Sequence, residues 1–186
     1  MDTQTQASSH LRYCLFPTAI GDCGIAWSER GVTRLQLPES DRAATERRLK
    51  ARAAGAEAGD PPAPILAVIA DIQRYARGER VDFSAIAVDM PEIEPLRRDV
   101  YAVARSIGWG ETASYGEIAR RIGAPDAREV GQALSRNPVP IVVPCHRVLA
   151  SDGRLHGFSA YGGLLTKERL LSLEGFGADA PRLPGL

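Results

Sequence analysis

One cysteine in this sequence has neighbours suited to nucleophilic chemistry. Cys145 stands between Pro144 and His146, and an apolar run at 141–143 leads into this group. Proline fixes the backbone angle φ and has no N–H, so this segment would present the thiol from a rigid position. A thiolate is a strong nucleophile, and an imidazole that reaches the thiol, directly or through a water, would take its proton. The residue types are therefore compatible with a cysteine that acts as a nucleophile.

The residues before Cys145 also admit a structural interpretation. The run 141–143 has the apolar character of a buried strand, entered from one proline turn and ended by Pro144. A cysteine after such a run is commonly a small core residue. On an extended backbone the side chains of Cys145 and His146 would point apart, so their adjacency alone does not predict a direct bond.

The first half of the chain predicts an α/β region. Alternating or short apolar segments separated by turn residues indicate three strands in a meander, and longer segments with apolar residues at three- and four-residue steps indicate helices. We expect strands at 11–16, 24–27, 32–37 and 81–88, helices at 41–55 and 64–77, and a loop at 56–63.

The second half predicts helices around the cysteine. Ser114 and Glu117 match a capping box at the start of a short helix that ends at Gly123. Pro125 can occupy the first position of the next helix, which would run to Asn137. Two helices joined by a tight glycine turn are typical of a helix-turn-helix, although a plain helical hairpin has the same pattern. Further helices are expected at 95–106 and 164–173.

The composition indicates an ordinary globular chain with no strong overall charge. The 186 residues contain 23 Lys and Arg against 23 Asp and Glu, and the pI is about 6.8. Between residues 105 and 154, seven arginines against five acids leave a local surplus of two positive charges. A dedicated nucleic-acid binder is usually more basic, so DNA binding would depend on local charge. The sequence has no apolar run of transmembrane length and no apolar leader, and we expect a cytoplasmic protein.

The cysteine count points to a reducing compartment. The chain has three cysteines, an odd number without the spacing of a disulfide framework. Cys14 and Cys23, with His10 nearby, offer too few ligands at convincing spacing to predict a metal site. A buried strand cysteine is the favoured interpretation for both.

The segment around Cys145 resembles a known active-site signature. Pro144-Cys145-His146-Arg147-Val148, with Asn137-Pro138 upstream, is similar to the signature of the O6-alkylguanine-DNA alkyltransferases, also called methylated-DNA–protein-cysteine methyltransferases. The similarity is weak before about residue 91 and strong from about 110 to 175. It implies an N-terminal α/β domain of ribonuclease-H-like shape at 1–92, and a mostly helical C-terminal domain with a winged helix-turn-helix at 93–186.

The same resemblance implies a function. Family members flip O6-alkylguanine out of duplex DNA and transfer the alkyl group irreversibly to their own cysteine. The chain would act once, as a monomer, without a cofactor or metal. By position, Cys145 would be the acceptor, His146 the base acting through a water, and Glu174 the residue that orients the imidazole.

The resemblance also assigns residues around the cysteine. Asn137 would tie the recognition helix to the active-site turn, Tyr115 would donate a proton or hydrogen bond to N3 of guanine, and Arg128 would fill the gap left by the flipped base. The predicted pocket wall comprises Pro140, Val148, Phe158 and Ser159. Arg136 is a further predicted DNA contact.

Three departures from the family pattern bear on substrate range. Ile93-Glu94-Pro95-Leu96-Arg97 stands where the family has Gly-Thr-x-Phe-Gln, Glu129 and Gln132 lie in the recognition helix, and the loop 158–163 is longer than usual, so that Tyr161 would narrow the pocket. The neutral charge and Glu129 keep open one alternative, a family member with a non-DNA alkyl donor. A second alternative, a damage-recognition protein without transfer, is disfavoured because such relatives lack the cysteine that this chain has. A cysteine hydrolase is disfavoured because no oxyanion-hole signature is present.

Overall fold

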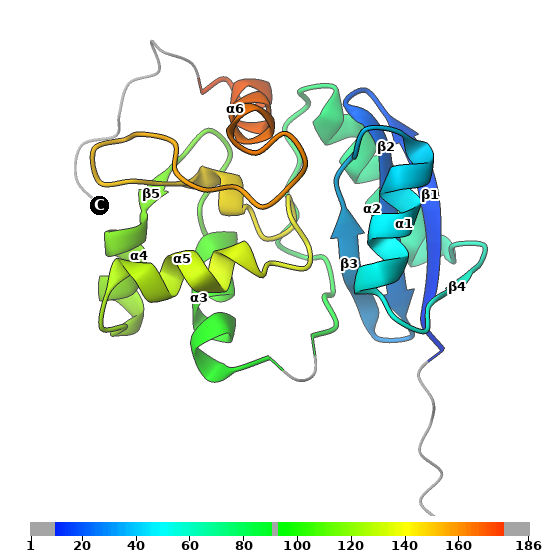
Figure 1. The fold of residues 1–186 in the computed structure, drawn as a ribbon, viewed down its shortest axis with the longest axis horizontal. Helices are drawn as coiled ribbons and strands as arrows, with labels where there is room; N and C mark the ends of the chain where they lie inside the picture. The colour runs from blue at the N-terminus through cyan, green and yellow to red at the C-terminus, as the bar shows by residue number, and fades with distance from the viewer. Residues whose placement is uncertain (1–9, 91–92, 177–186) are drawn as a thin grey trace, which may run out of the picture.

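The computed structural model describes residues 10–90 and 93–176, and its first part is built on a four-stranded mixed sheet (Figure 1). The strand order is β3-β2-β1-β4; the first three strands are antiparallel, and β4 runs parallel to β1. The strands are β1 Arg12–Thr18, β2 Gly21–Ser28, β3 Gly31–Gln36 and β4 Glu57–Ala58.

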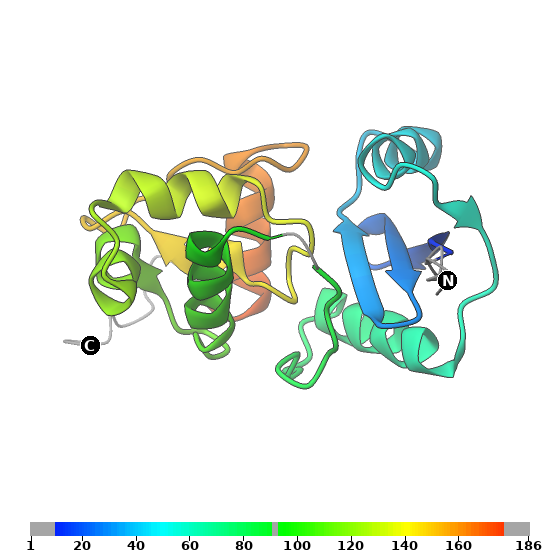
Figure 2. The same ribbon diagram turned by 90° about the horizontal axis from the view of Figure 1, so that it is seen from below.

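One helix covers each face of this sheet (Figure 2). Helix α1, Arg42–Arg52, packs its buried Leu49 against Tyr13 and Ala26. Helix α2, Ala63–Ala76, packs on the other face, where its apolar stripe joins the main core. Strand β2 lies inside the sheet, and its side chains point alternately to the two faces that the helices cover. It is therefore buried over most of its length.

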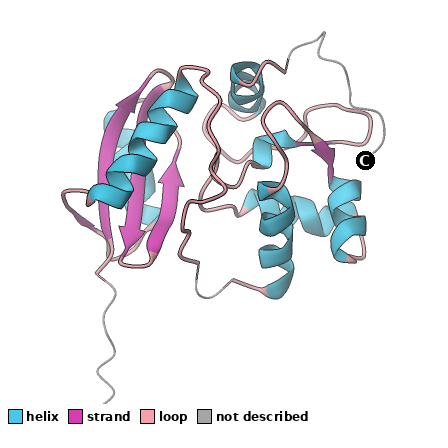
Figure 3. Ribbon diagram, turned by 180° about the vertical axis from the view of Figure 1, so that it is seen from behind, coloured by secondary structure: helices cyan, strands magenta, loops and turns pink. Residues whose placement is uncertain are grey.

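The second part of the chain is mainly helical and lies beside the sheet (Figure 3). Its elements are α3 Pro95–Arg105, β5 Ala113–Ser114, α4 Tyr115–Ile122, α5 Ala127–Ser135, the 3-10 turn Cys145–Arg147, β6 Val148–Leu149 and α6 Leu164–Leu173. The short strands β5 and β6 pair in parallel. One apolar cluster runs through both parts, so the two share a core.

Local sequence signals explain how α4 and α5 are held. The predicted capping box is confirmed, because the Ser114 hydroxyl accepts from Glu117 N and the Glu117 carboxylate accepts from Ser114 N. Gly123 ends α4 in the left-handed region at φ 69°, which favours glycine. The next helix differs from the prediction, which placed Pro125 at its first position and its end at Asn137: Asp126 is the N-cap, the first helical residue is Ala127, and α5 ends at Ser135.

Two expectations for the first part are wrong. The segment 81–88 forms no strand and has one bridge, between Val88 and Val32. The Arg105 side chain donates to the carbonyls of Phe83, Ser84 and Ile86. These hydrogen bonds replace those that a neighbouring strand would make. The predicted loop 56–63 contains β4, which pairs with the start of β1.

The predicted strand at 141–143 is also wrong. Ile141 has φ 73°, which is rare for a β-branched residue, and Val143 N donates to Val139 O at 2.9 Å, so the chain forms a compact turn. Prolines on both sides lack the N–H groups that a strand would pair. Cys145 then begins a 3-10 turn, and the extended backbone that would separate Cys145 from His146 is absent.

The described residues contain neither a membrane-spanning helix nor a cluster of metal ligands. Among the helices placed by the structure, none is long and apolar enough to cross a membrane. Within residues 10–90 and 93–176, no group of three or more His, Cys, Asp or Glu side chains is arranged to hold a metal ion. Cys23 is buried, and burial raises the pKa of its thiol to about 12.

Candidate active site

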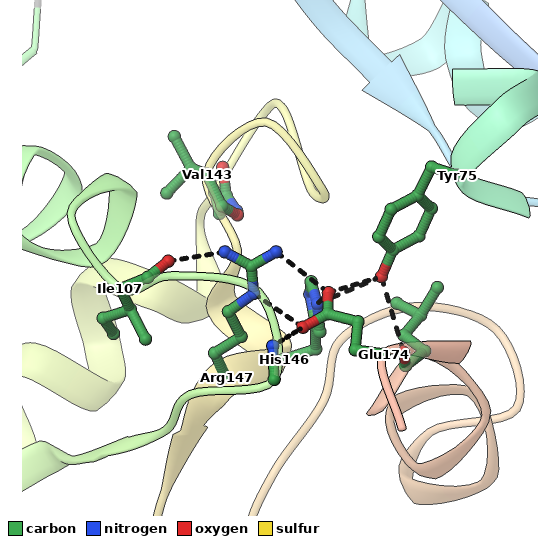
Figure 4. Close-up of polar contacts among 9 residues, drawn as sticks. Tyr75, Ile107, Val143, His146, Arg147 and Glu174 are labelled. Atoms are coloured by element: carbon green, nitrogen blue, oxygen red, sulfur yellow. Dashed lines mark hydrogen bonds and ion pairs between the residues drawn. The ribbon is translucent and has the colours of Figure 1, made fainter. Parts of the chain in front are cut away.

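A buried network of four side chains includes the two residues that follow Cys145 in the chain (Figure 4). His146 Nε2 is 2.7 Å from Glu174 Oε1, and the Tyr75 hydroxyl lies 3.1 Å from the same nitrogen. Tyr75 also donates to Glu174 Oε1 at 2.9 Å. The charged partner is Arg147, whose Nε and Nη2 donate to the two carboxylate oxygens at 2.8 and 3.0 Å. We call these residues the Glu174 network.

The fold brings the Glu174 network together from three distant segments. His146 and Arg147 sit in the 3-10 turn, Glu174 follows the last residue of α6, and Tyr75 comes from α2 on the sheet. Gly110 N donates to Glu174 Oε2 at 3.2 Å, so each of the two carboxylate oxygens accepts more than one hydrogen bond. A buried carboxylate with this many donors is held in one orientation.

The network fixes the protonation states of its members. Burial by itself would raise the pKa of Glu174, but the hydrogen bonds and charges of His146 and Arg147 lower it to about 2. Burial lowers the pKa of His146, so the imidazole is neutral at pH 7. An ionised Glu174 only accepts hydrogen bonds, and Nε2 must therefore carry the imidazole proton.

The other imidazole nitrogen is left as a base. His146 Nδ1 is buried and has no hydrogen-bond partner among the described residues. Since Nε2 carries the proton, Nδ1 holds a lone pair, and a buried lone pair is costly to leave unpaired. The neighbouring residue in the same 3-10 turn is Cys145.

Cys145 lines a cavity next to this network. Its side chain is 9% exposed, and burial raises the pKa of the thiol, while Asn137 and the Lys167 ammonium act in the opposite direction. Asn137 Nδ2 donates to Val143 O at 2.7 Å and its Oδ1 accepts from Val139 N at 3.0 Å. These two bonds tie the end of α5 to the turn that carries the cysteine, as the sequence predicts.

Lys167 is a buried cation beside this site. Its ammonium donates to Val148 O at 2.6 Å and to His156 O at 3.0 Å, and it lies 3.5 Å from the Tyr115 hydroxyl. Burial lowers its pKa to about 8. Carbonyl oxygens leave its charge unneutralised, so it favours a negative charge on nearby sulfur.

The cavity itself has a volume of about 860 Å³. Tyr115, Arg128, Phe158 and Ser159 line it together with Cys145, so five predicted site residues converge there. A volume of this size accommodates a purine base. The remaining lining residues are Gly116, Ala127, Gly131, Gln132, Leu134, Ser135, Ala150, Ser151, His156 and Gly157.

Other predicted residues lie elsewhere. Pro140 lines a narrower recess that also contains Cys145, Phe158 and Ser159. Val148 is fully buried and contributes its carbonyl to Lys167. Arg136 follows α5 and lines a separate hollow, and Tyr161 is 54% exposed outside the cavity that it was expected to narrow.

Sequence reasoning missed Tyr75, Arg147 and Lys167 as site residues. Arg147 lay inside the quoted motif, and its place next to His146 was a signal that could have found it. Lys167 sits on the buried face of α6, where a lysine among leucines is unusual. Tyr75 falls on the apolar stripe of α2, and no local pattern separates it from an ordinary core tyrosine.

Comparison with known proteins places this arrangement in a family. The family model described as 6-O-methylguanine DNA methyltransferase, DNA binding domain, matches residues 95–176. A methylated-DNA–protein-cysteine methyltransferase of Methanothermobacter thermautotrophicus is 36% identical over 154 residues, which are 83% of this chain and 80% of that protein. The chain belongs to the methylated-DNA–protein-cysteine methyltransferase family. The Mycobacterium leprae member is 47% identical over 107 residues, 57% of this chain and 62% of the relative.

Solved structures of the family share the fold. The Mycobacterium tuberculosis protein OGT, solved in complex with DNA, superposes with a TM-score of 0.71 at 33% identity, covering 88% of this chain and 92% of that one. The O6-methylguanine-DNA methyltransferase of Pyrococcus kodakaraensis KOD1 superposes with a TM-score of 0.65 at 25% identity, covering 89% and 99%. Both likenesses extend over the sheet and the helices.

Proposed function

We propose that this protein repairs DNA by transferring the alkyl group of O6-alkylguanine to its own Cys145, irreversibly and once per molecule. The observation that carries the proposal is that Cys145 lines a base-sized cavity, while Nδ1 of its sequence neighbour His146 is buried without a hydrogen-bond partner among the described residues. The likeness to methylated-DNA–protein-cysteine methyltransferases supports it. All groups of the proposed mechanism come from one chain, which supports action as a monomer on double-stranded DNA.

In the proposed reaction, the Cys145 thiol gives its proton through a water to His146 Nδ1. The thiolate sulfur attacks the alkyl carbon, the sulfur–carbon bond forms, and the bond from that carbon to O6 breaks. Its electron pair passes to the guanine ring, which takes up a proton or hydrogen bond at N3 from Tyr115. Burial and the Cys145 charge raise the pKa of Tyr115, so this hydroxyl is protonated and able to donate at neutral pH.

We also propose how the fold divides this work. The α/β part, with a ribonuclease-H-like shape, would form one domain at 1–92, and the winged helix-turn-helix would form another at 93–186. The packing of α4 against α5 across the Gly123 turn supports the helix-turn-helix, and the loop 150–163 after β6 would serve as the wing. Helix α5 would enter the groove, because its exposed residues Arg128, Gln132 and Ser135 line the cavity mouth.

The proposal is tested by the intact mass of the protein after incubation with a duplex that carries one O6-methylguanine. We expect a gain equal to one methylene group, mapped to the peptide containing Cys145. No gain, with Cys145 still reactive toward a thiol reagent, would favour a non-DNA donor or a binding protein without transfer.

Replacing Arg128 with alanine should slow repair of duplex DNA more than attack on a free alkylated base. Base extrusion costs a few kcal/mol, which corresponds to roughly 10- to 100-fold in rate if Arg128 offsets that cost. Single-turnover rates on both substrates measure the difference. Arg121→Ala removes an exposed arginine of α4 outside the cavity lining and serves as the matched control. Equal losses on both substrates would contradict the role.

Replacing Lys167 with methionine should raise the pKa of the Cys145 thiol. The change removes the positive charge that favours the thiolate and keeps a flexible apolar side chain in its place. A shift of about one pKa unit lowers the thiolate fraction at neutral pH roughly tenfold. The pH dependence of Cys145 alkylation by iodoacetamide measures this shift. An unchanged alkylation profile would show that the charge of Lys167 does not affect the pKa of the Cys145 thiol.

A further inference from the structure

A cationic hollow next to α5 takes no part in the Glu174 network. It lies between β3, the start of α3 and the turn after α5, and its volume is about 280 Å³. Arg34 of β3, Arg97 of α3 and Arg136 after α5 all line it. These three residues are 39 or more positions apart along the sequence, so the tertiary fold gathers them.

The positive charge in this hollow is only partly balanced. Arg97 pairs with the exposed Glu94 at 3.3 Å, whereas Arg34 and Arg136 have no acidic partner among the residues that the structure places. Asp89 also lines the hollow, but it accepts from the Ser28 hydroxyl and pairs with Arg30 at 3.0 Å. Because acids in the hollow are already engaged, an added anion would find free guanidinium groups.

Tyr101 is a further polar residue of the hollow. It is 3% exposed, and its hydroxyl donates to Ala133 O of α5 at 2.9 Å. Burial raises the pKa of Tyr101 to about 12, while Arg97 and Arg136 act to lower it. Thr33 also lines the hollow, and its hydroxyl is buried with no hydrogen-bond partner among the described residues.

The hollow also lies in line with α5. Helix α5 has nine residues and is therefore about 13 Å long. Arg128, near its start, lines the active-site cavity, and Arg136 follows its end. Leu35 N donates to Pro138 O at 2.9 Å and fixes β3 against the segment that carries Arg136. A duplex lying along α5 would thus reach the hollow with its backbone.

We propose that Arg34, Arg97 and Arg136 form a binding site for a phosphodiester group of the DNA strand next to α5. The planar guanidinium fork matches phosphate oxygens. The site deepens the proposed function and rests on it. It gives a chain of zero net charge a local positive site for DNA. Through Arg34 of β3, the sheet would also contribute to DNA binding.

The test compares paired double variants by DNA binding at several salt concentrations. Fluorescence anisotropy with an unmodified duplex gives the slope of log affinity against log salt, and each phosphate contact contributes about 0.9 to that slope. We expect Arg34→Gln with Arg136→Gln to reduce the slope by about 1 and the low-salt affinity roughly tenfold. Arg34→Lys with Arg136→Lys should keep most of the slope, since the charge remains.

The control removes two charges elsewhere. Arg47→Gln with Arg77→Gln changes exposed residues of α1 and of the C-terminal end of α2, and it should leave the slope unchanged. An equal drop in the control, or a wild-type slope in the glutamine variant, overturns the site. The urea-unfolding midpoint of each variant, compared with that of the wild type, shows that the variants are folded.

The two proposals fail in different ways. If the wild-type protein does not transfer a methyl group from the modified duplex, the proposed function is wrong. If it transfers and the glutamine variant binds with the wild-type slope, repair stands and only the phosphate site is wrong.

Discussion

Replacing Cys145 with alanine is expected to abolish alkyl transfer and to leave duplex binding intact. The reaction needs a sulfur in the wall of the cavity, and neither of the other two thiols lines it. Cys23 is fully buried, with its pKa raised to about 12, and burial also raises the pKa of Cys14 on the distant sheet. Neither would supply a thiolate at neutral pH.

The measurement is intact mass after incubation with excess O6-methylguanine duplex, followed by a binding titration of the same variant. Cys14→Ala is the matched control, because it removes a half-buried cysteine and should transfer with the wild-type stoichiometry. A methyl adduct on the Cys145→Ala protein would refute the assignment. Loss of duplex binding in that variant would show that the substitution disturbs the fold.

Regular elements of this fold could be predicted from sequence because their signals are local. The apolar stripe of α2, the capping box of α4 and the alternation in β3 each lie within one element, and each predicted element is present. The error at Pro125 has a local cause as well. Asp126 caps α5 through two backbone N–H groups, and a capping side chain outweighs proline's preference for the first turn.

The strand predicted at 141–143 failed because burial was mistaken for extension. Ile141, Val142 and Val143 are all buried, as a core strand would be, but they are buried in a turn. Asn137 provides the hydrogen bonds that this turn needs, so the segment needs no strand partner. A conformation held by one side chain six residues away leaves no periodic signal.

The residues of the candidate site that match the family pattern could be predicted from the sequence. Those that only tertiary packing brings to the site could not. The resemblance carried Cys145, His146 and Glu174, and the structure brings His146 and Glu174 together. Tyr75 lies 71 positions before His146 and looks like any core aromatic residue in the sequence. Its polar role depends on where α2 meets α6, which is a property of tertiary packing.

The Glu174→Gln variant is expected to lose both stability and activity, because Glu174 holds the buried charge of Arg147. Glutamine has nearly the same shape but leaves that guanidinium without a negative partner. Removing one member of a buried ion pair costs about 3–5 kcal/mol of unfolding free energy. The depressed pKa leads to a similar figure: a drop from 4.5 to about 2 corresponds to about 3 kcal/mol.

The pH dependence of stability tests the same charge. The folded-state pKa of Glu174 lies below its unfolded value, so its contribution is complete above about pH 4.5 and is lost as pH falls toward 2. Urea unfolding between these pH values should show this loss in the wild type and a smaller loss in Glu174→Gln. Glu79→Gln is the control, since Glu79 pairs with Arg74 and Arg77 at the surface and solvent screens it.

Activity separates positioning from stability in this variant. Without the Glu174 carboxylate, the negative charge that favours the proton of His146 on Nε2 is lost, and Nδ1 is held less firmly as the base. Transfer to duplex should therefore slow by roughly 10²-fold or more even at a temperature where the variant is fully folded. Tyr75→Phe removes one hydrogen bond to Glu174 and keeps the ion pair with Arg147, so its effect should be smaller on both measures. If Glu174→Gln transferred at the wild-type rate while folded, Glu174 would serve only to neutralise Arg147, and His146 would need another source of orientation.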